Sequence, residues 1–256
     1  MPPESLRAAV ALGLVLCAGV GCKQKPADTQ ARPAAQQVEK SAELPKPLVQ
    51  TVLTSEERQT LTPDRIVRGL REGNERFVSG TLTVRDHSAQ VRASVGSQFP
   101  KAAFLSCLDS RIPIEDVFDR GIGDVFVARV AGNFENTDIL GSLEFATKVA
   151  GAKVILVLGH GDCGAIKAAI DGVELGNITP MLSNIQPAVA HFAEYAGEKS
   201  SNNTEFLKMV TEQNVRMTMS DIRSRSPIIQ ELADAGEVRI IGGVYYMDSG
   251  RVHFIE

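Results

Sequence analysis

The stretch that decides the fold is residues 153–169, KVILVLGHGDCGAIKAA. An unbroken apolar run over 154–158 is typical of a strand that is buried on both faces of a parallel sheet. A glycine-containing turn follows, and the segment that starts at Ala165 predicts a helix. We therefore expect His160 and Cys163 at the carboxyl end of the most buried strand, where ligands bind in open sheets of this kind.

Apolar and helical segments alternate through the rest of the folded part. Two more buried strands are expected at 101–107 and 124–130, and the last segment, 237–256, predicts a pair of strands joined by a turn. Helices are expected at 61–80, 87–95, 137–151, 180–196 and 203–223. In the first of these helices Thr62 is the expected N-cap and Pro63 lies in the first turn. This order predicts an α/β fold: a mainly parallel β-sheet with an antiparallel edge strand, flanked by α-helices.

The composition excludes some classes of partner. The chain has 256 residues, of which 43% are hydrophobic and 23% charged, which is enough to bury one substantial core. The formal net charge of −4 gives no reason to expect nucleic acid or acidic lipid as a partner. Tryptophan is absent from the sequence, so stacking platforms for bases are not expected.

The N-terminal residues predict export rather than a folded element. Arg7 precedes a short apolar run over 8–20, which is typical of a signal peptide, here residues 1–22. GVGC at 19–22 resembles the cleavage box of a bacterial lipoprotein, with Cys22 as the residue that would carry lipid. The alternatives are a plain secretory signal and an uncleaved anchor. We expect an exported protein, in the periplasm or on the outer face of a bacterial membrane.

A tether is expected between this signal and the folded domain. Residues 23–60 are rich in Gln, Ala, Pro and Lys and have no sustained apolar period. Such a composition cannot bury enough surface to offset chain entropy. The predicted organisation is therefore a signal at 1–22, a flexible tether at 23–60 and one folded domain at 61–256.

Cysteine and histidine side chains converge on one edge of the predicted sheet. In FLSCLDSRIP, another predicted strand ends in Cys107, which is followed closely by Asp109 and Arg111. If the two strands are neighbours, Cys107 meets His160 and Cys163. Two thiolates and one imidazole make a zinc set of the three-ligand type, which leaves one position for water or substrate. The alternatives are a Cys107–Cys163 disulfide, which would leave the other residues unexplained, and an Asp109–Arg111 salt bridge that only holds a loop.

At these residues the chain resembles the β-class carbonic anhydrases. Three motifs carry the resemblance in the same order: Cys107-Leu-Asp109-Ser110-Arg111, FVARVAGN at 126–133, and GHGDCGAIKAA at 159–169. The preceding GSQFPKAAFLSC resembles the family's Gly-x-Gln-x-Pro approach to the first cysteine. The resemblance covers residues 61–256.

The resemblance implies a complete set of site residues. Cys107, His160 and Cys163 would bind Zn²⁺, with water or hydroxide as the fourth ligand, and Asp109 would act as a pair with Arg111. The resemblance also implies that Gln98 hydrogen-bonds the substrate, and that Phe126 and Ala131 help to wall an apolar pocket. The protein would be a homodimer or a higher homo-oligomer, with its N-terminal helices packed on the partner.

The chemistry of these groups suits the reversible hydration of carbon dioxide to bicarbonate and a proton. Zinc lowers the pKa of bound water from about 15.7 towards about 7. Asp109, held and kept ionised by Arg111, can accept the hydrogen of zinc-bound hydroxide and aim an oxygen lone pair at carbon dioxide. If the pair broke, Asp109 could become a fourth ligand and close the site.

Two other functions use the same residues. Carbonyl sulfide or carbon disulfide could be hydrolysed at the same zinc, and no residue in the sequence excludes this. A non-catalytic module that binds zinc or bicarbonate is the third hypothesis, although a metal binder alone has no need of the Asp109–Arg111 pair. The expected partners are carbon dioxide or bicarbonate and a second copy of the chain. Nucleic acid is not expected, and membrane contact is expected only through lipid on Cys22.

Overall fold

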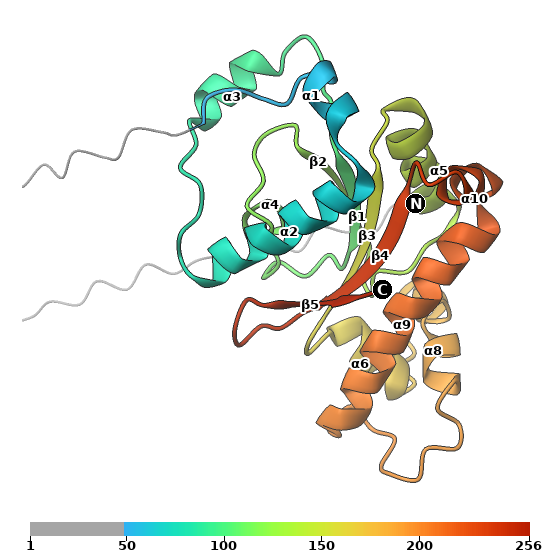
Figure 1. Ribbon diagram of the computed structural model, residues 1–256. Coiled ribbons are helices and arrows are strands. Elements are labelled where there is room, and N and C mark those ends of the chain that lie inside the picture. Colours follow the sequence, from blue (N-terminus) through green and yellow to red (C-terminus); the bar gives the residue numbers. More distant parts are fainter. Residues whose placement is uncertain (1–48) are drawn as a thin grey trace, which may run out of the picture. The chain divides into compact units, whose positions relative to one another are not determined.

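The computed structural model describes residues 49–256 (Figure 1). The predicted signal at 1–22 and most of the predicted tether therefore lie outside the described residues. Within 49–256, no helix is both long enough and apolar enough to cross a membrane.

Five strands form one sheet in the order β2-β1-β3-β4-β5. The strands are β1 (Ala102–Ser106), β2 (Val125–Arg129), β3 (Val154–His160), β4 (Arg239–Tyr245) and β5 (Val252–Ile255). The first four in this order are mutually parallel, and β5 pairs with β4 in the antiparallel direction at the edge. The predicted fold class is confirmed.

The pairing of β1 with β3 positions the site. Ser106 lies opposite Leu158 in the parallel register, so the two strands end at the same edge of the sheet. Cys107 therefore lies beside the end of β3, where His160 is the last strand residue. Two segments that are far apart in the sequence meet there because their strands are neighbours.

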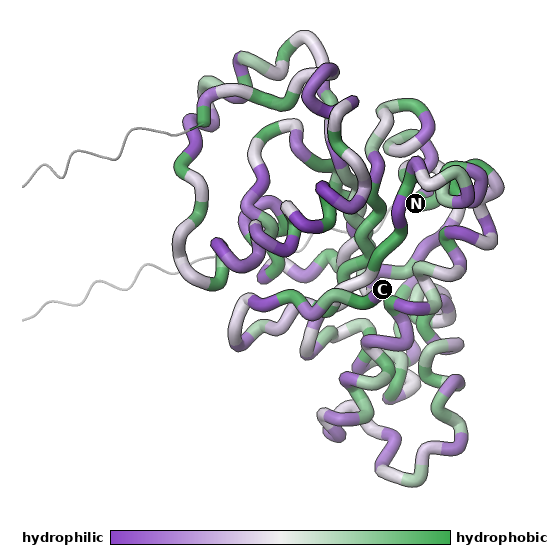
Figure 2. Tube along the Cα trace, viewed as in Figure 1, coloured by the Kyte–Doolittle hydropathy of each residue, from purple (hydrophilic) through white to green (hydrophobic). Residues whose placement is uncertain are grey.

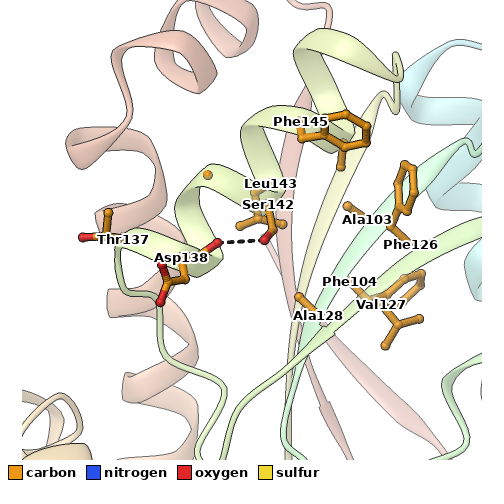
Figure 3. A pocket seen from close by; sticks show the side chains of 12 residues that line it. Ala103, Phe104, Phe126, Val127, Ala128, Thr137, Asp138, Ser142, Leu143 and Phe145 are labelled. Carbon is orange, nitrogen blue, oxygen red and sulfur yellow. Dashed lines mark hydrogen bonds between the residues drawn. The ribbon is translucent and has the colours of Figure 1, made fainter.

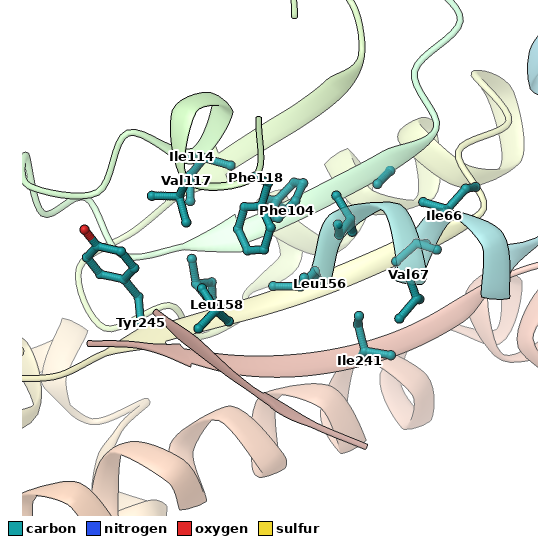
Figure 4. Packing of buried hydrophobic residues seen from close by; sticks show 14 of the residues in the cluster. Ile66, Val67, Phe104, Ile114, Val117, Phe118, Leu156, Leu158, Ile241 and Tyr245 are labelled. Carbon is teal, nitrogen blue, oxygen red and sulfur yellow. The ribbon is translucent and has the colours of Figure 1, made fainter. Parts of the chain in front are cut away.

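Strand β3 is buried along its whole length, as its apolar run predicts. Leu156 and Leu158 pack in one apolar cluster, and Ile155 and Val157 pack in another on the opposite face. Figure 4 shows the first cluster around Phe104, and Figure 2 shows hydrophobic residues concentrated along the central strands. Each face of the sheet thus needs its own cover of helices.

Helices cover both faces of the sheet. They are α1 (Ser55–Thr60), α2 (Pro63–Val78), α3 (His87–Ala93), α4 (Ile114–Val117), α5 (Thr137–Glu144), the π-helical turn η1 (Phe145–Val149), α6 (Gly164–Ile170), α7 (Ile178–Leu182), α8 (Gln186–Ala190), α9 (Thr204–Arg225) and α10 (Pro227–Asp234). Helices α2 and α4 contribute to the first apolar cluster, and α5, α9 and α10 contribute to the second. Helix α9 approaches β4 closely at Gly242, where a Cβ atom would lie 2.6 Å from Val215 and from Met219.

Two of the expected boundaries differ from the structure. Residues 180–196 hold two short helices with turns after them rather than one helix, because Pro187 must lie in the first turn of a helix and is the second residue of α8. Residues 55–60, in the expected tether, form α1, where Thr54 and Glu57 make a capping box. The last part of the 23–60 segment is therefore folded. The expected capping of α2 by Thr62 is confirmed.

Asn74 on α2 ties this helix to two other segments. Its Nδ2 donates to the Val117 carbonyl at 3.1 Å and to the Gly250 carbonyl at 2.9 Å, and its Oδ1 accepts from the Val252 amide at 2.8 Å. The Asn74 side chain is buried. If these bonds were absent, its three partners would therefore have neither Asn74 nor water to bond to.

We expect Asn74→Ala to lower the free energy of unfolding by about 2–4 kcal/mol, because three buried hydrogen bonds are lost and their partners stay unsatisfied. Equilibrium unfolding in urea measures the change. Arg68→Ala, at an exposed position of the same helix, is the control and should change stability by about 0.5 kcal/mol or less. Equal effects of the two substitutions would show that the Asn74 bonds contribute little.

Candidate metal centre

Three potential metal ligands meet where β1 and β3 end. Cys107 follows β1 directly, His160 ends β3, and Cys163 is the N-cap residue of α6. Their ligand atoms lie within 4.8 Å of one another, and all three residues are buried. Within residues 49–256 this is the one group of at least three His, Cys, Asp or Glu residues arranged in this way. The sequence predicted that these residues would meet on the condition that their strands are neighbours, and β1 and β3 do pair.

The two cysteines of the centre are free thiols. Their sulfur atoms lie 3.9 Å apart and are not bonded, so the structure does not contain the disulfide that the sequence left open. The pKa of Cys107 is lowered, chiefly because the Cys163 thiol donates to its sulfur. The pKa of Cys163 is raised by that same interaction and by burial, and the amides of Ile166 and Ala165 at the start of α6 oppose the rise. One sulfur of the pair is thus readily ionised, as a metal ligand must be.

His160 is held in the orientation that a metal ligand needs. Its Nδ1 lies 2.9 Å from the Gly161 carbonyl, which can only accept, so Nδ1 carries the proton. The other ring nitrogen, Nε2, is buried and has no hydrogen-bond partner among residues 49–256. A buried lone pair without a donor is costly unless something binds it. Together with two adjacent sulfurs, this fits a metal ion such as zinc.

Asp109 and Arg111 form a two-pronged ion pair beside this group. The Arg111 amide and Nε each lie 2.9 Å from Asp109 Oδ1, and an Arg111 terminal nitrogen lies 2.7 Å from Oδ2. These hydrogen bonds hold the pKa of Asp109 well below its usual range. Asp109 Oδ2 also lies 3.9 Å from His160 Nε2, so the carboxylate faces the position that a metal would take.

Arg129, which sequence analysis did not single out, fixes the loop that carries Asp109. Its guanidinium donates to the main-chain carbonyls of Cys107, Asp109 and Ile112. Arg129 ends β2, and the register places it opposite Ser106. It therefore anchors the loop to a neighbouring strand, and only the strand pairing reveals this role.

A turn after β2 supplies a further contact to the sulfur of Cys107. The Gly132 amide donates to Cys107 Sγ at 3.4 Å. Ala131 precedes Gly132 in this turn, and the wall role that the resemblance implied for it remains a prediction. Sequence analysis quoted this segment as a motif but did not recognise the Gly132 amide as a contact to a ligand.

Gln98 and Phe126 lie elsewhere in the protomer. Gln98 is exposed and precedes β1, and its neighbour Phe99 lies against Arg58, which donates to the carbonyl of Ala150 before β3. This is the opposite end of the sheet from Cys107, since β1 spans roughly 16 Å. Within one chain, Gln98 does not reach the group.

Phe126 lies three residues before the end of β2. It is paired in register with Ala103, and its ring contacts Phe145 with 6.3 Å between ring centres. It lines a groove at the sheet edge rather than the cysteine group. The roles expected for Gln98 and Phe126 therefore remain predictions.

The fold and the site define an α/β protein with a two-thiolate, one-imidazole metal centre at the carboxyl ends of neighbouring parallel strands. The family model described as carbonic anhydrase matches residues 102–252. "Carbonic anhydrase 2" of Mycobacterium tuberculosis is 34% identical over 192 residues, covering 72% of this chain and 88% of that protein. The carbonic anhydrase of Mycolicibacterium smegmatis is 34% identical over 191 residues, covering 72% and 89%.

A solved structure agrees with these sequence matches. A tetrameric β-carbonic anhydrase from Sordaria macrospora aligns with a TM-score of 0.57 at 26% identity, covering 62% of this chain and 82% of that one. The chain therefore belongs to the β-class carbonic anhydrase family. It is a carbonic anhydrase whose cofactor is zinc, and the group of Cys107, His160 and Cys163 fits that ion.

Proposed function

We propose that the chain hydrates carbon dioxide reversibly at zinc held by Cys107, His160 and Cys163, with Asp109 and Arg111 as the pair that orients the nucleophile. One observation carries the proposal. The Asp109 carboxylate faces His160 Nε2 at 3.9 Å while Arg111 binds both of its oxygens. A protein that only stored metal would have no use for a carboxylate fixed in this position.

Each residue has a distinct task in this mechanism. Zinc, when bound, supplies a positive charge that acidifies a water molecule at neutral pH. Asp109 stays ionised because Arg111 lowers its pKa, so it can accept a hydrogen bond from the attacking nucleophile and set its direction. Arg111 also keeps the carboxylate from turning towards the metal. We propose that loss of this pairing would let Asp109 bind zinc and close the site.

The surroundings of the two cysteines suit an apolar substrate. Cys107 and Cys163 belong to a buried apolar cluster that includes Phe134, Ile166 and Ile185. Carbon dioxide carries no charge, so apolar walls favour its binding. The same walls disfavour water, which would lose hydrogen bonds there. Ala131 would contribute to the same wall.

Substrate assays test the proposal against its alternatives. The zinc-loaded protein should hydrate carbon dioxide much faster than it hydrolyses carbonyl sulfide or carbon disulfide. The reverse order would indicate that these sulfur compounds are the substrates. Full zinc content without any turnover at neutral or mildly alkaline pH would favour a non-catalytic binding module.

We also propose that the protein is a homo-oligomer in which a second copy covers the β2 edge. β2 pairs with β1 on one side, and among the described residues no strand pairs with its other side. A groove of about 680 Å³ lies along this edge, with the rings of Phe126 and Phe145 beside it (Figure 3). Exposed apolar strand edges favour pairing with another chain. The solved relative from Sordaria macrospora is a tetramer, which supports this proposal.

A charge in this groove should break the oligomer. Phe145 is 53% exposed in the single chain, and Phe145→Glu would bury a carboxylate in the proposed interface. We expect at least about 30-fold weaker self-association, measured by analytical ultracentrifugation. Leu175→Glu, at an exposed apolar residue outside the groove, is the control. A wild-type monomer, or a Phe145→Glu variant with unchanged mass, would contradict the proposed interface.

For the residues before the described part, we propose export and lipid anchoring. The sequence of 1–22 supports a signal, GVGC supports lipid on Cys22, and the composition of 23–48 supports a tether. The domain would then lie in the periplasm or on the outer face of a membrane. Mass spectrometry of the N-terminal peptide tests this, since Cys22→Ser should abolish the lipid and release the protein. A cleaved N-terminus without lipid would indicate a plain secretory signal, and an intact one would indicate an uncleaved anchor.

A further inference from the structure

A buried asparagine on α9 contacts the turn that faces Cys107. Asn214 Nδ2 donates to the Gly132 carbonyl at 2.8 Å, across 82 residues of sequence. The Gly132 amide in turn donates to Cys107 Sγ at 3.4 Å. Asn214 is only 3% exposed, so its amide group does not simply face solvent. A chain of two hydrogen bonds thus connects α9 to a sulfur of the metal centre.

The turn between these two bonds has a choice of conformations. The Asn133 amide bonds to the Val130 carbonyl at 3.0 Å, so residues 130–133 form a β-turn. Gly132 is its third residue and has φ +88°, which is typical of a type II turn. Types I and II differ mainly by a flip of the central peptide, and that peptide carries the Gly132 amide. A flip would turn this N–H away from Cys107.

Two contacts of Gly132 fix where this residue lies. A Cβ atom at this position would lie 2.4 Å from Ile185 Cδ1, so only glycine fits the space. Glycine by itself is conformationally permissive and does not choose one turn type. A flip of the central peptide leaves the Gly132 carbonyl almost unmoved, so the bond from Asn214 does not select the turn type. It holds the turn against α9 and so sets the distance between the Gly132 amide and Cys107 Sγ.

We propose that Asn214 is a positioning residue of the metal centre: by holding the Gly132 carbonyl, it keeps the Gly132 amide directed at the sulfur of Cys107. The inference rests on the proposed ligation of zinc by that sulfur. An N–H donor withdraws charge from a thiolate and fixes its direction, and groups that orient metal ligands in this way typically change metal affinity by about 10–100-fold. Asn214 needs no contact with substrate for this role.

The surroundings of Asn214 decide which substitution tests the role. Asn214 lines a mostly polar hollow of about 220 Å³, together with Thr218 and Glu135. Truncation to alanine would leave room for water from this hollow, which could donate to Gly132 in place of the lost amide. Asn214→Asp keeps the shape and excludes that water, but it sets a carboxylate oxygen against the Gly132 carbonyl, and two acceptors repel.

The test measures how fast zinc leaves. We expect zinc to transfer from Asn214→Asp to a chelator about 10–100-fold faster than from the wild type, and Asn214→Ala to fall between them. With Co²⁺ in place of zinc, the sulfur-to-cobalt charge-transfer band should shift in Asn214→Asp. Thr218→Val, one helical turn further along α9 and lining the same hollow, is the matched control and should change neither quantity.

The outcomes separate this inference from the proposed function. Wild-type release rates and an unchanged cobalt band in Asn214→Asp would overturn the positioning role. If Asn214→Asp does not fold, Asn214→Leu takes its place, because leucine has a similar shape, leaves no room for that water and offers no donor. An unchanged release rate and cobalt band in Asn214→Leu would overturn the role equally. A wild-type protein that binds no zinc would instead refute the ligand set, whatever Asn214 does.

Discussion

Cys163→Ser should leave the protein without stoichiometric zinc, and carbon dioxide hydration should fall to the uncatalysed rate. A serine hydroxyl does not ionise near neutral pH, so only Cys107 and His160 would remain as ligands. Two ligands at one edge of a sheet do not hold zinc tightly, because structural and catalytic sites use three or four protein ligands. Metal analysis after gel filtration and stopped-flow hydration measure the two losses.

A matched variant distinguishes metal loss from misfolding. Ala169→Ser places the same hydroxyl in the same buried apolar cluster without removing a sulfur. It should retain zinc and most of the activity, with a modest loss of stability. Stoichiometric zinc in a folded Cys163→Ser variant would show that Cys163 is not a ligand.

The second large effect is expected from Asp109→Asn, which should keep zinc and lose about 10²–10³-fold in kcat. The substitution preserves the size of the side chain and leaves Cys107 and His160 in place. It removes the charge that binds Arg111, and the amide offers a donor where the carboxylate offered an acceptor. Loss of one group that orients or stabilises the reacting atoms typically costs this much.

Two measurements on each variant make this result interpretable. Metal content shows whether the centre is intact, and stopped-flow hydration gives kcat. Asp116→Asn, at an exposed carboxylate on α4, is the control and should behave as the wild type. Undiminished turnover in Asp109→Asn would mean that Asp109 does not direct the nucleophile, and the Asp109–Arg111 pair would then be a loop contact.

The sequence predicted those parts of the fold that depend on local pattern. The apolar run of β3 has no polar interruption, so its burial on both faces could be inferred directly. Thr62 and Pro63 marked the start of α2 because caps and first turns have strong residue preferences. Helix α1 was missed because six residues with no buried side chain carry no apolar period, although Thr54 and Glu57 form a recognisable capping box.

The site was predictable only where its residues are close in sequence or end a strand. The spacing of His160 and Cys163, and of Asp109 and Arg111, is local and could be read without the structure. The meeting of Cys107 with His160 followed from the assumption that their strands are neighbours, which the register confirms. No pattern connected Arg129 or Asn214 to the centre, because their contacts depend on tertiary packing alone.

The pairing of β1 with β3 also decides when this protein can acquire its metal. Cys107 joins His160 and Cys163 only through that pairing, so an unfolded chain offers a cation at most a partial set of donors. Loading must therefore follow folding. For the exported form proposed above, the ion would come from the compartment where the chain folds, and the active fraction would depend on how much zinc is free outside the cytoplasm rather than within it.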